Sequence, residues 1–472
     1  MSESTSAAVA PPVDDFEENR RKTKKALPAL LTVFTLGQLM TQAFNLVFQN
    51  IGDSLGMSQQ AALISTLPGI VLGVVCMLYG TLCDFISPKR LTVAGVGALV
   101  VGALLGFFGA GSFWAVVIAR MIQVAGGQVC GSVFLVMVVK YLRDNEKSVY
   151  IGVFNAIFYL ASGIGVLAGG VVSAFDWKFL FLIPLLALLV LPLIVKNTPD
   201  VSGLHQHIDW VGITLFAIIA ALLAIVFSFP SVWLVVAIVV LGIVFGVYVA
   251  KAKQPFLTVS MVKNLPFMVL LSMIFLFCFF DFACVPIYNV IAADVYDISL
   301  TMVSVCLFLV YVVAVIVGLI TGPIVNAIGR ERTIILAAVM MVIGFCVSGL
   351  LVKSGLVLLT ILACLFMAGM TLVYTPLYDS TSDSLPVEER GRGIGLCDLS
   401  MNTGASLGMA VYSSLMASPA FASVGFFGVE PGPNAAVSNM FWIMGLAALV
   451  TLLIFLAFRK RIRKGVEENA GE

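Results

Sequence analysis

The sequence predicts an all-α integral membrane protein of about fourteen transmembrane helices. We expect two pseudo-symmetric six-helix bundles plus a two-helix insert, for three reasons. Apolar residues make up 61% of the 472 residues and charged residues only 11%, a composition typical of a chain whose solvent is lipid. Apolar stretches long enough to cross the hydrocarbon layer recur along the whole chain. An internal repeat relates its two halves.

The repeat consists of two short polar segments, each placed between two apolar stretches. The first reads Gly80-Thr-Leu-Cys-Asp84-Phe-Ile-Ser87-Pro88-Lys89-Arg90, and the second reads Gly322-Pro-Ile-Val-Asn326-Ala-Ile-Gly329-Arg330-Glu331-Arg332. Such a duplication indicates a chain built from two related helical bundles, an architecture that belongs mostly to secondary transporters.

Apolar runs of roughly 18 to 25 residues predict the membrane-spanning helices. The first six lie near 27–49, 62–83, 91–110, 113–138, 149–172 and 178–195. A further pair lies near 210–229 and 232–250, and the last six near 266–291, 302–325, 333–352, 355–377, 394–417 and 438–458. The predicted domains are a disordered cytosolic tail (1–26), an N-terminal six-helix bundle (27–196), a linker with the two-helix insert (197–252), a C-terminal six-helix bundle (253–459) and a second cytosolic tail (460–472).

The positions of lysine and arginine indicate the orientation, because cytoplasmic loops are enriched in these residues. With the N-terminus inside, all but three of the 26 basic residues fall on the cytoplasmic side; Lys178 and Lys353 lie outside and Arg120 lies within a span. We therefore expect a multi-pass protein of the cell (plasma or inner) membrane with both termini in the cytoplasm.

Several kinds of chemistry are disfavoured. The nine cysteines all lie in or at the edge of apolar spans, and His205 and His207 share a loop without clustered ligands, so we expect neither disulfides nor a metal site. The sequence has no phosphate-cradling Gly-Lys-Ser/Thr loop and no Ser/His/Asp constellation. We expect no enzyme activity, no cofactor and no nucleic-acid partner.

Four local patterns resemble the major facilitator superfamily, in its fourteen-helix drug:proton antiporter branch. The repeat resembles the motif Gly-x-x-x-Asp-x-x-Gly-Arg-Lys/Arg-x, and Arg120 with Gln123 is similar to Arg-x-x-Gln-Gly. The fifth span resembles the antiporter signature Gly-x-x-x-Gly-Pro-x-x-Gly-Gly through Gly165, Gly169 and Gly170, with Val166 in place of the proline. The helix pair opened by Asp209 and Trp210 resembles the insert of this branch, and we interpret it as a lipid-facing spacer. In the first span, Met40 replaces the aspartate that family members often carry.

The resemblance implies a cytoplasmic gate at the repeat. An aspartate at a helix end can face the positive N-terminus of a neighbouring helix and lock two bundles together until it is protonated. The expected gating residues are Asp84, Lys89, Arg90, Asn326, Arg330 and Arg332. The alternative is a charged anchor at the level of the lipid headgroups.

The first span carries a stripe of amides, Gln38, Gln42, Asn45 and Gln49, at steps of four, three and four. Residues at this spacing share one helix face. Such amides either contact a substrate in a cavity or hydrogen-bond another helix.

Asp281 lies deep in the ninth span. Hydrocarbon disfavours a charged carboxylate, so reversible protonation is feasible at this position and makes Asp281 the preferred proton-coupling residue. Arg120 must face the protein interior or a water-filled cavity. The alternative is that the two residues form a permanent ion pair. Further candidate substrate contacts are Gln123, Tyr288, Tyr374, Tyr378 and Asp398, whereas Asp379 and Asp383 are either contacts or headgroup-level charges.

The leading functional hypothesis is proton-coupled efflux of amphipathic organic compounds or drugs by alternating access. The runner-up is an uptake permease or facilitator for a small metabolite or organic anion, which Arg120 would anchor. A non-transporting sensor or scaffold would need a soluble domain that neither tail is long enough to form. The expected partners are a small-molecule substrate, protons and the lipid bilayer, and the protein is expected to be a monomer.

Overall fold

A computed structural model describes residues 13–199, 208–252 and 255–470. Within these ranges every regular element is a helix, and thirteen helices are long and apolar enough to cross a membrane. The prediction of an all-α membrane protein is therefore confirmed. The predicted span 394–417 corresponds to α15 (Val387–Met416), which has sufficient length but is more polar than those thirteen helices. His205 and His207 lie outside the described residues.

The N-terminal group of helices comprises α1 (Val13–Ser54), η1 (Ser58–Gln60), α2 (Leu63–Phe85), α3 (Pro88–Phe108), α4 (Phe113–Tyr141), α5 (Asp144–Val172), η2 (Trp177–Leu186) and α6 (Ala187–Asn197). The first helix begins well before the membrane span, so residues 13–26 are helical and not a disordered tail. Ion pairs from Arg20 (2.7 Å) and Lys24 (2.5 Å) to Glu146 hold this extension against the start of α5. The helix α3 begins three residues before the predicted span, at Pro88, because Ser87 accepts a hydrogen bond from the Arg90 amide and Pro88 occupies the first helical position.

The insert comprises α7 (Trp210–Ser228) and α8 (Val232–Lys251). Asp209 caps α7 by accepting a hydrogen bond from the Gly212 amide at 2.8 Å. The two helices pack against each other, and α7 also packs against α2 and α15.

The C-terminal group comprises α9 (Val259–Lys263), α10 (Leu265–Cys278), η3 (Asp281–Ala283), α11 (Pro286–Val290), the π-helix η4 (Ile291–Val295), α12 (Leu300–Ile328), α13 (Arg330–Leu350), α14 (Leu356–Asp383), α15, α16 (Pro419–Ala422) and α17 (Pro433–Ala470). The predicted span 266–291 is not one continuous α-helix, because it breaks between Cys278 and Pro286. Proline lacks the amide hydrogen that a helix interior requires. The last helix runs to Ala470, so most of the predicted tail 460–472 is helical.

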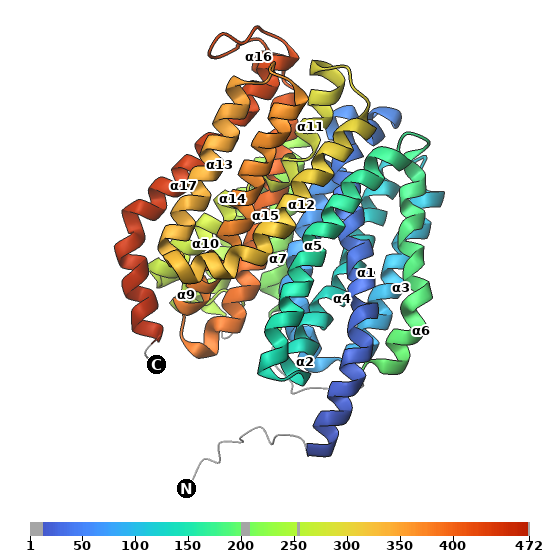
Figure 1. Ribbon diagram of the computed structural model, residues 1–472, viewed down its shortest axis with the longest axis vertical. Coiled ribbons are helices and arrows are strands. Elements are labelled where there is room, and N and C mark those ends of the chain that lie inside the picture. The colour runs from blue at the N-terminus through green and yellow to red at the C-terminus, as the bar shows by residue number, and fades with distance from the viewer. Residues whose placement is uncertain (1–12, 200–207, 253–254, 471–472) are drawn as a thin grey trace.

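The two groups meet along α5 and α12, along α2 and α15, and between α1 and α11. Small residues permit this close approach: a Cβ atom at Gly163 of α5 would lie 2.8 Å from Tyr311 of α12. The start of α1 and the end of α17 lie at the same end of the molecule, the lower end in Figure 1. We call this the terminal end and the other the distal end.

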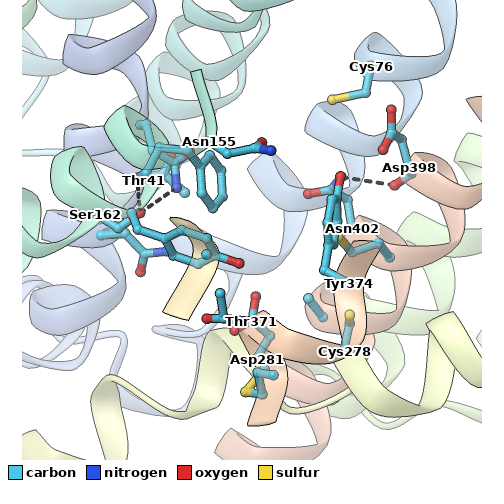
Figure 2. A pocket seen from close by; sticks show the side chains of 18 of the residues that line it. Thr41, Cys76, Asn155, Ser162, Cys278, Asp281, Thr371, Tyr374, Asp398 and Asn402 are labelled. Carbon is cyan, nitrogen blue, oxygen red and sulfur yellow. Dashed lines mark hydrogen bonds between the residues drawn. The ribbon is translucent and has the colours of Figure 1, made fainter. Parts of the chain in front are cut away.

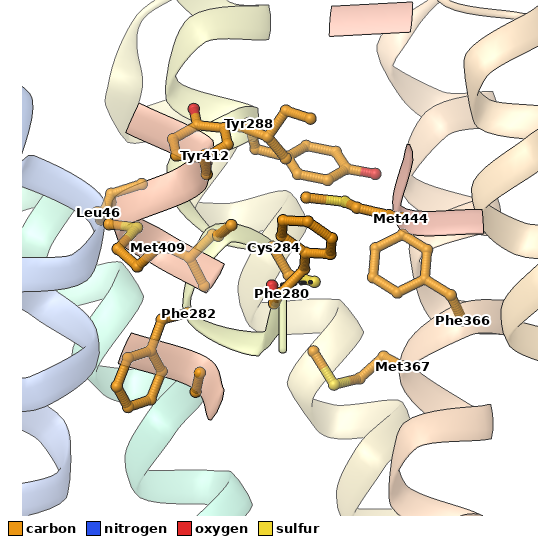
Figure 3. Packing of buried hydrophobic residues seen from close by; sticks show 14 of the residues in the cluster. Leu46, Phe280, Phe282, Cys284, Tyr288, Phe366, Met367, Met409, Tyr412 and Met444 are labelled. Atoms are coloured by element: carbon orange, nitrogen blue, oxygen red, sulfur yellow. Dashed lines mark hydrogen bonds between the residues drawn. The ribbon is translucent and has the colours of Figure 1, made fainter. Parts of the chain in front are cut away.

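A dense apolar cluster fills the space between the two groups on the distal side of the middle. Figure 3 shows Leu46, Phe282, Tyr288, Met409 and Tyr412 packed there. Leu46 and Tyr288 are fully buried. This cluster bounds the site described next.

Candidate functional site

A central cavity of about 200 Å³ lies where the two groups of helices meet. Its wall is formed by α1, α2, α4 and α5 from the N-terminal group and by α10, η3, α12, α14 and α15 from the C-terminal group. Figure 2 shows polar side chains from both groups directed into one space. The lining reaches closer to the terminal end, at Leu135 and Thr321, than to the distal end.

Five of the predicted site residues line this cavity: Gln38, Gln42, Asp281, Tyr374 and Asp398. They come from α1, the broken ninth span, α14 and α15. The fold therefore brings together residues that are separated by up to 360 positions (398 minus 38) in the chain.

The charged side chains in the described lining of the cavity are all acidic. Its lining, as far as the structure describes it, contains two carboxylates, Asp281 and Asp398, and no lysine, arginine or histidine. Asp281 is the first residue of the short turn η3, which follows the end of α10 at Cys278 after Phe279 and Phe280. A carboxylate at a helix break is accessible from the cavity even though its span is buried in the bundle.

Asp398 is held in place by its neighbours. The hydroxyl of Tyr378 donates a hydrogen bond to its carboxylate at 3.0 Å, and the ring of Tyr378 stacks on Tyr374 with centroids 4.2 Å apart. Tyr374 itself lines the cavity, whereas Tyr378 does not. Tyr378 therefore touches the cavity only through its contacts with Asp398 and Tyr374.

Arg120 and Gln123 lie inside the N-terminal group and outside the cavity lining. Arg120 is 2% exposed, and its guanidinium donates a hydrogen bond to the Gln123 side-chain oxygen and lies 4.3 Å from the centre of the Phe44 ring. Among the described residues no carboxylate lies within ion-pair distance of Arg120. The structure therefore does not bring Arg120 and Asp281 together.

The amide stripe of the first span divides along its length. Gln38 faces the cavity and donates to Ser162 of α5 at 3.0 Å. Asn45 is 2% exposed and contacts Gln42 at 3.5 Å. Gln49 faces the distal mouth, where it donates to Asp53 at 2.9 Å. Only the half of the stripe nearer the terminal end can contact a molecule in the central cavity.

Tyr288 does not reach the cavity. It is fully buried, and its hydroxyl donates to the Leu359 carbonyl at 2.8 Å. The ring packs instead in the apolar cluster on the distal side.

The predicted gating residues lie at the terminal end. Lys89 and Arg90 form the first turn of α3, while Asn326 and Arg332 are exposed near the junction of α12 and α13. Arg330 pairs with Asp383 at 2.6 Å and with Asp379 at 3.9 Å, so these two aspartates take part in a surface ion-pair network. The side chain of Asp84, near the end of α2, lies outside the described part of the chain.

The three glycines of the antiporter-like pattern are contact points. A Cβ atom would lie 2.3 Å from the Leu39 carbonyl oxygen at Gly165 and 2.9 Å from the Ala43 carbonyl oxygen at Gly169. At Gly170 it would lie 2.3 Å from the Ser304 hydroxyl of α12. Two of the glycines thus allow α5 to approach α1, and the third allows contact with the other group.

Hydrogen bonds join the two groups on the distal side of the cavity. The Asn289 side-chain amide of α11 donates to the Leu46 carbonyl at 3.0 Å and to Asn50 at 2.8 Å, both on α1. Thr301 of α12 donates to the Gly170 carbonyl of α5 at 3.2 Å. These bonds and the apolar cluster hold the distal end closed.

Several lining residues were missed by the sequence reasoning. They are Cys76, Asn155, Ser162, Cys278, Thr371 and Asn402, all labelled in Figure 2. Helical spacing could have identified part of this set, because Asn155, Tyr159 and Ser162 share one face of α5, and Asn402 follows Asp398 by one turn.

Comparison with known proteins places the chain in a family. The Major Facilitator Superfamily model matches residues 30–206 and 270–472. The protein belongs to this superfamily of membrane transporters, which implies a transporter and not an enzyme.

The curated relatives share 24% to 26% sequence identity with this chain. The chain is 24% identical to the multidrug transporter protein MdtP of Bacillus subtilis over 78% of its own length and 70% of that protein. It is 26% identical to multidrug resistance protein 3 of the same organism, covering 53% of this chain and 52% of that one. It is also 26% identical to the vacuolar membrane amino acid uptake transporter fnx2 of Schizosaccharomyces pombe, covering 39% and 32%. In the last two cases the chain spans less than two thirds of its relative.

Solved structures share the fold. A peptide transporter POT in complex with sulfate matches with a TM-score of 0.65 at 17% identity, covering 93% of this chain and 95% of that one. The human organic anion transporter MFSD10 matches with a TM-score of 0.59 at 15% identity, covering 91% and 99%. At these identities the likeness shows the fold alone.

Proposed function

We propose that this protein is a secondary active exporter that moves amphipathic organic compounds across the cell membrane in exchange for protons. The observation that carries this proposal is the central cavity, whose described lining holds two carboxylates and no base. A carboxylate surrounded by apolar residues is costly when charged, so binding a proton or a cationic substrate relieves the same unfavourable charge. Protonation of one carboxylate weakens the attraction of the cavity for a cation held at the other, and this competition is the physical basis of antiport.

In this proposal the chain forms two pseudo-symmetric six-helix halves, 27–196 and 253–459, with α7 and α8 inserted between them. The polar helix α15 is the fourteenth membrane-crossing helix, and both termini lie in the cytoplasm, as the distribution of basic residues favours. The closed distal end and the cavity displaced toward the terminal end support a cytoplasm-facing conformation.

We assign proton coupling to Asp281, because it faces the cavity from a break in its helix. Asp398, Gln38, Gln42 and Tyr374 are the proposed substrate contacts. Arg120 remains a candidate for an indirect role, since its buried charge contacts Phe44 and Gln123 of the N-terminal group.

The lining also favours amphipathic substrates. Aromatic and methionine side chains supply an apolar surface, and amides and hydroxyls supply a few fixed hydrogen bonds. Two relatives bear multidrug names, which agrees with a broad substrate range.

The test uses proteoliposomes with the cytoplasmic face outward and an acidic interior. We expect a fluorescent organic cation to accumulate inside and to leak out when the pH gradient is collapsed. Asp281→Asn is expected to abolish proton-driven accumulation while substrate binding is retained. Asp297→Asn is a matched control, because Asp297 is exposed and its φ of 50° is well tolerated by asparagine. Accumulation by Asp281→Asn equal to that of the control would exclude the assigned role.

An uptake transporter for a small metabolite is the second candidate, favoured by the likeness to an amino acid uptake transporter. The two functions differ in direction. Accumulation only in vesicles with the distal face outward would identify uptake.

A further inference from the structure

The insert helix α7 lies across the line along which the two groups of helices meet. It packs against α2 of the N-terminal group and against α15 of the C-terminal group. Its partner α8 packs on α7, and the α8 side chains Val232 and Trp233 are 78% and 80% exposed. The expectation of a lipid-facing spacer therefore fits α8 and the outer face of α7, whereas the inner face of α7 packs on both groups.

Specific contacts hold α7 in place near both of its ends. At the terminal end, the Asp209 carboxylate accepts hydrogen bonds from the Gly212 amide at 2.8 Å, the Tyr248 hydroxyl of α8 and the Phe256 amide at 2.9 Å. At the distal end, the ring of Phe229 stacks on Trp114 of α4 with centroids 6.4 Å apart. A helix fixed at both ends is suited to cover the whole line of contact.

The surface beneath α7 is the outer side of the cavity wall. On α15, Asp398 and Asn402 face the cavity, whereas Leu396 and Leu399 pack in one apolar cluster with Ile213 of α7. On α2, Cys76 faces the cavity, whereas Val74 and Leu78 pack against the same cluster. Asp398 is therefore separated from α7 by only the thickness of one helix.

We propose that α7 is a shield that keeps lipid away from Asp398. A carboxylate exposed to acyl chains is strongly unfavourable in a membrane. If the two groups shift relative to each other, the line between α2 and α15 must loosen, and lipid would then reach the wall that holds this acid. A helix that rests on both groups is placed to keep that line covered while the groups shift. This role for the insert does not depend on the direction of transport or on its coupling to protons.

The experiment measures how readily each cavity acid reacts with dicyclohexylcarbodiimide, a lipid-soluble reagent that modifies protonated carboxyl groups. The purified protein is reconstituted without substrate, and peptide mass spectrometry gives the ratio of modified Asp398 to modified Asp281. Asp281 serves as the internal reference, because reagent that enters through the cavity mouth reaches both acids.

Two variants displace α7 by different means. Ala220→Trp introduces a bulky ring at a position that is 3% exposed, and Asp209→Ala removes the hydrogen bonds that fix the helix start. Ile218→Trp places the same ring on the outer face of α7, where the side chain is 43% exposed, and is the matched control.

We expect the Asp398 to Asp281 ratio to rise severalfold in Ala220→Trp and Asp209→Ala and to stay at the wild-type value in Ile218→Trp. If Ala220→Trp does not fold, Asp209→Ala carries the comparison. Equal ratios in the wild type and the folded displaced variants would overturn the proposal, as would an equal rise in the control. Since no transport is measured, loss of the proposed exporter function would leave this result unaffected.

Discussion

At the scale of single residues, the amide stripe of α1 meets three different surroundings along its length. Helical periodicity correctly places Gln38, Gln42, Asn45 and Gln49 on one face. It does not tell what that face meets at each level of the membrane. The structure shows a cavity beside Gln38 and Gln42, packed protein around Asn45 and the distal mouth beside Gln49.

This division predicts different outcomes for Gln42→Ala and Asn45→Ala. The first should change the apparent affinity for hydrogen-bonding substrates by about fivefold, since one hydrogen bond contributes about 1 kcal/mol. The second should lower thermal stability and leave the order of substrate preference unchanged, because its side chain is buried away from the cavity. Binding assays on a substrate panel and thermal unfolding of both variants provide the check; identical shifts in substrate preference would refute the division.

Among single positions, a charged residue within an apolar span was the clearest sequence signal for a residue of the candidate site. Asp281 is conspicuous because it interrupts a run of phenylalanines, and it does line the cavity. Asn155 and Ser162 carry only the weaker signal of a shared helix face, and Thr371 carries none, since isolated polar residues are common in membrane helices. Their direction depends on how each helix is rotated, which neighbouring helices determine. The direction of the Arg120 side chain depends on helix rotation in the same way, so residue spacing did not predict its contact with Phe44.

At the scale of helices, hydropathy predicted which helices are present better than where each helix begins, breaks or ends. The ninth span is strongly apolar on average despite Asp281, yet its helix breaks after Cys278, and a hydropathy average does not detect such a break. The extension of α1 was missed for the opposite reason, since residues 17–25 are too polar to read as part of a span. Their helix is stabilised by charges on α5, which are distant in sequence.

The contact between this extension and α5 should depend on pH. Arg20 and Lys24 hold the pKa of Glu146 well below its usual range. A carboxyl with a lowered pKa in the folded state stabilises the contact fully above its unfolded value of about 4.3, and the contact is lost as pH falls through the lower folded value. Between pH 5 and pH 8 we therefore expect roughly constant protection of residues 17–26 in hydrogen exchange.

The variant Glu146→Gln should reproduce the acid state at neutral pH. Faster exchange is expected in residues 17–26, with the membrane-spanning part of α1 unchanged. Lys22→Gln is the control, because Lys22 pairs only with Glu18 of the same helix at 2.6 Å among its recorded ion pairs. Unchanged exchange in Glu146→Gln would mean that the extension is helical without its ion pairs.

At the scale of the whole molecule, the internal repeat predicted two related groups of helices, and the pairing of α5 with α12 and of α2 with α15 repeats the same kind of contact on two sides. The contacts that close one end were not predictable, because they join residues from different groups. Asn289 and Asn50 are 239 positions apart and lie outside the recognisable motifs.

The closed distal end yields a prediction about switching between conformations. Asn289 makes two hydrogen bonds across the boundary, to Leu46 and Asn50, whereas the neighbouring Gln49 bonds only within its own group, to Asp53 and Ser58. At about 1 kcal/mol for each bond, Asn289→Ala should shift the equilibrium toward a distal-open form by about 30-fold.

The native Cys278 reports this shift, because it lines the cavity beyond the apolar cluster. A membrane-impermeant thiol reagent applied from the distal side should modify Cys278 much faster in Asn289→Ala than in the wild type, as measured by mass spectrometry of its peptide. Gln49→Ala should behave like the wild type, since it removes hydrogen bonds from the same mouth without separating the two groups. If both variants expose Cys278 equally, the distal end is held by packing of the apolar cluster and not by the bonds of Asn289.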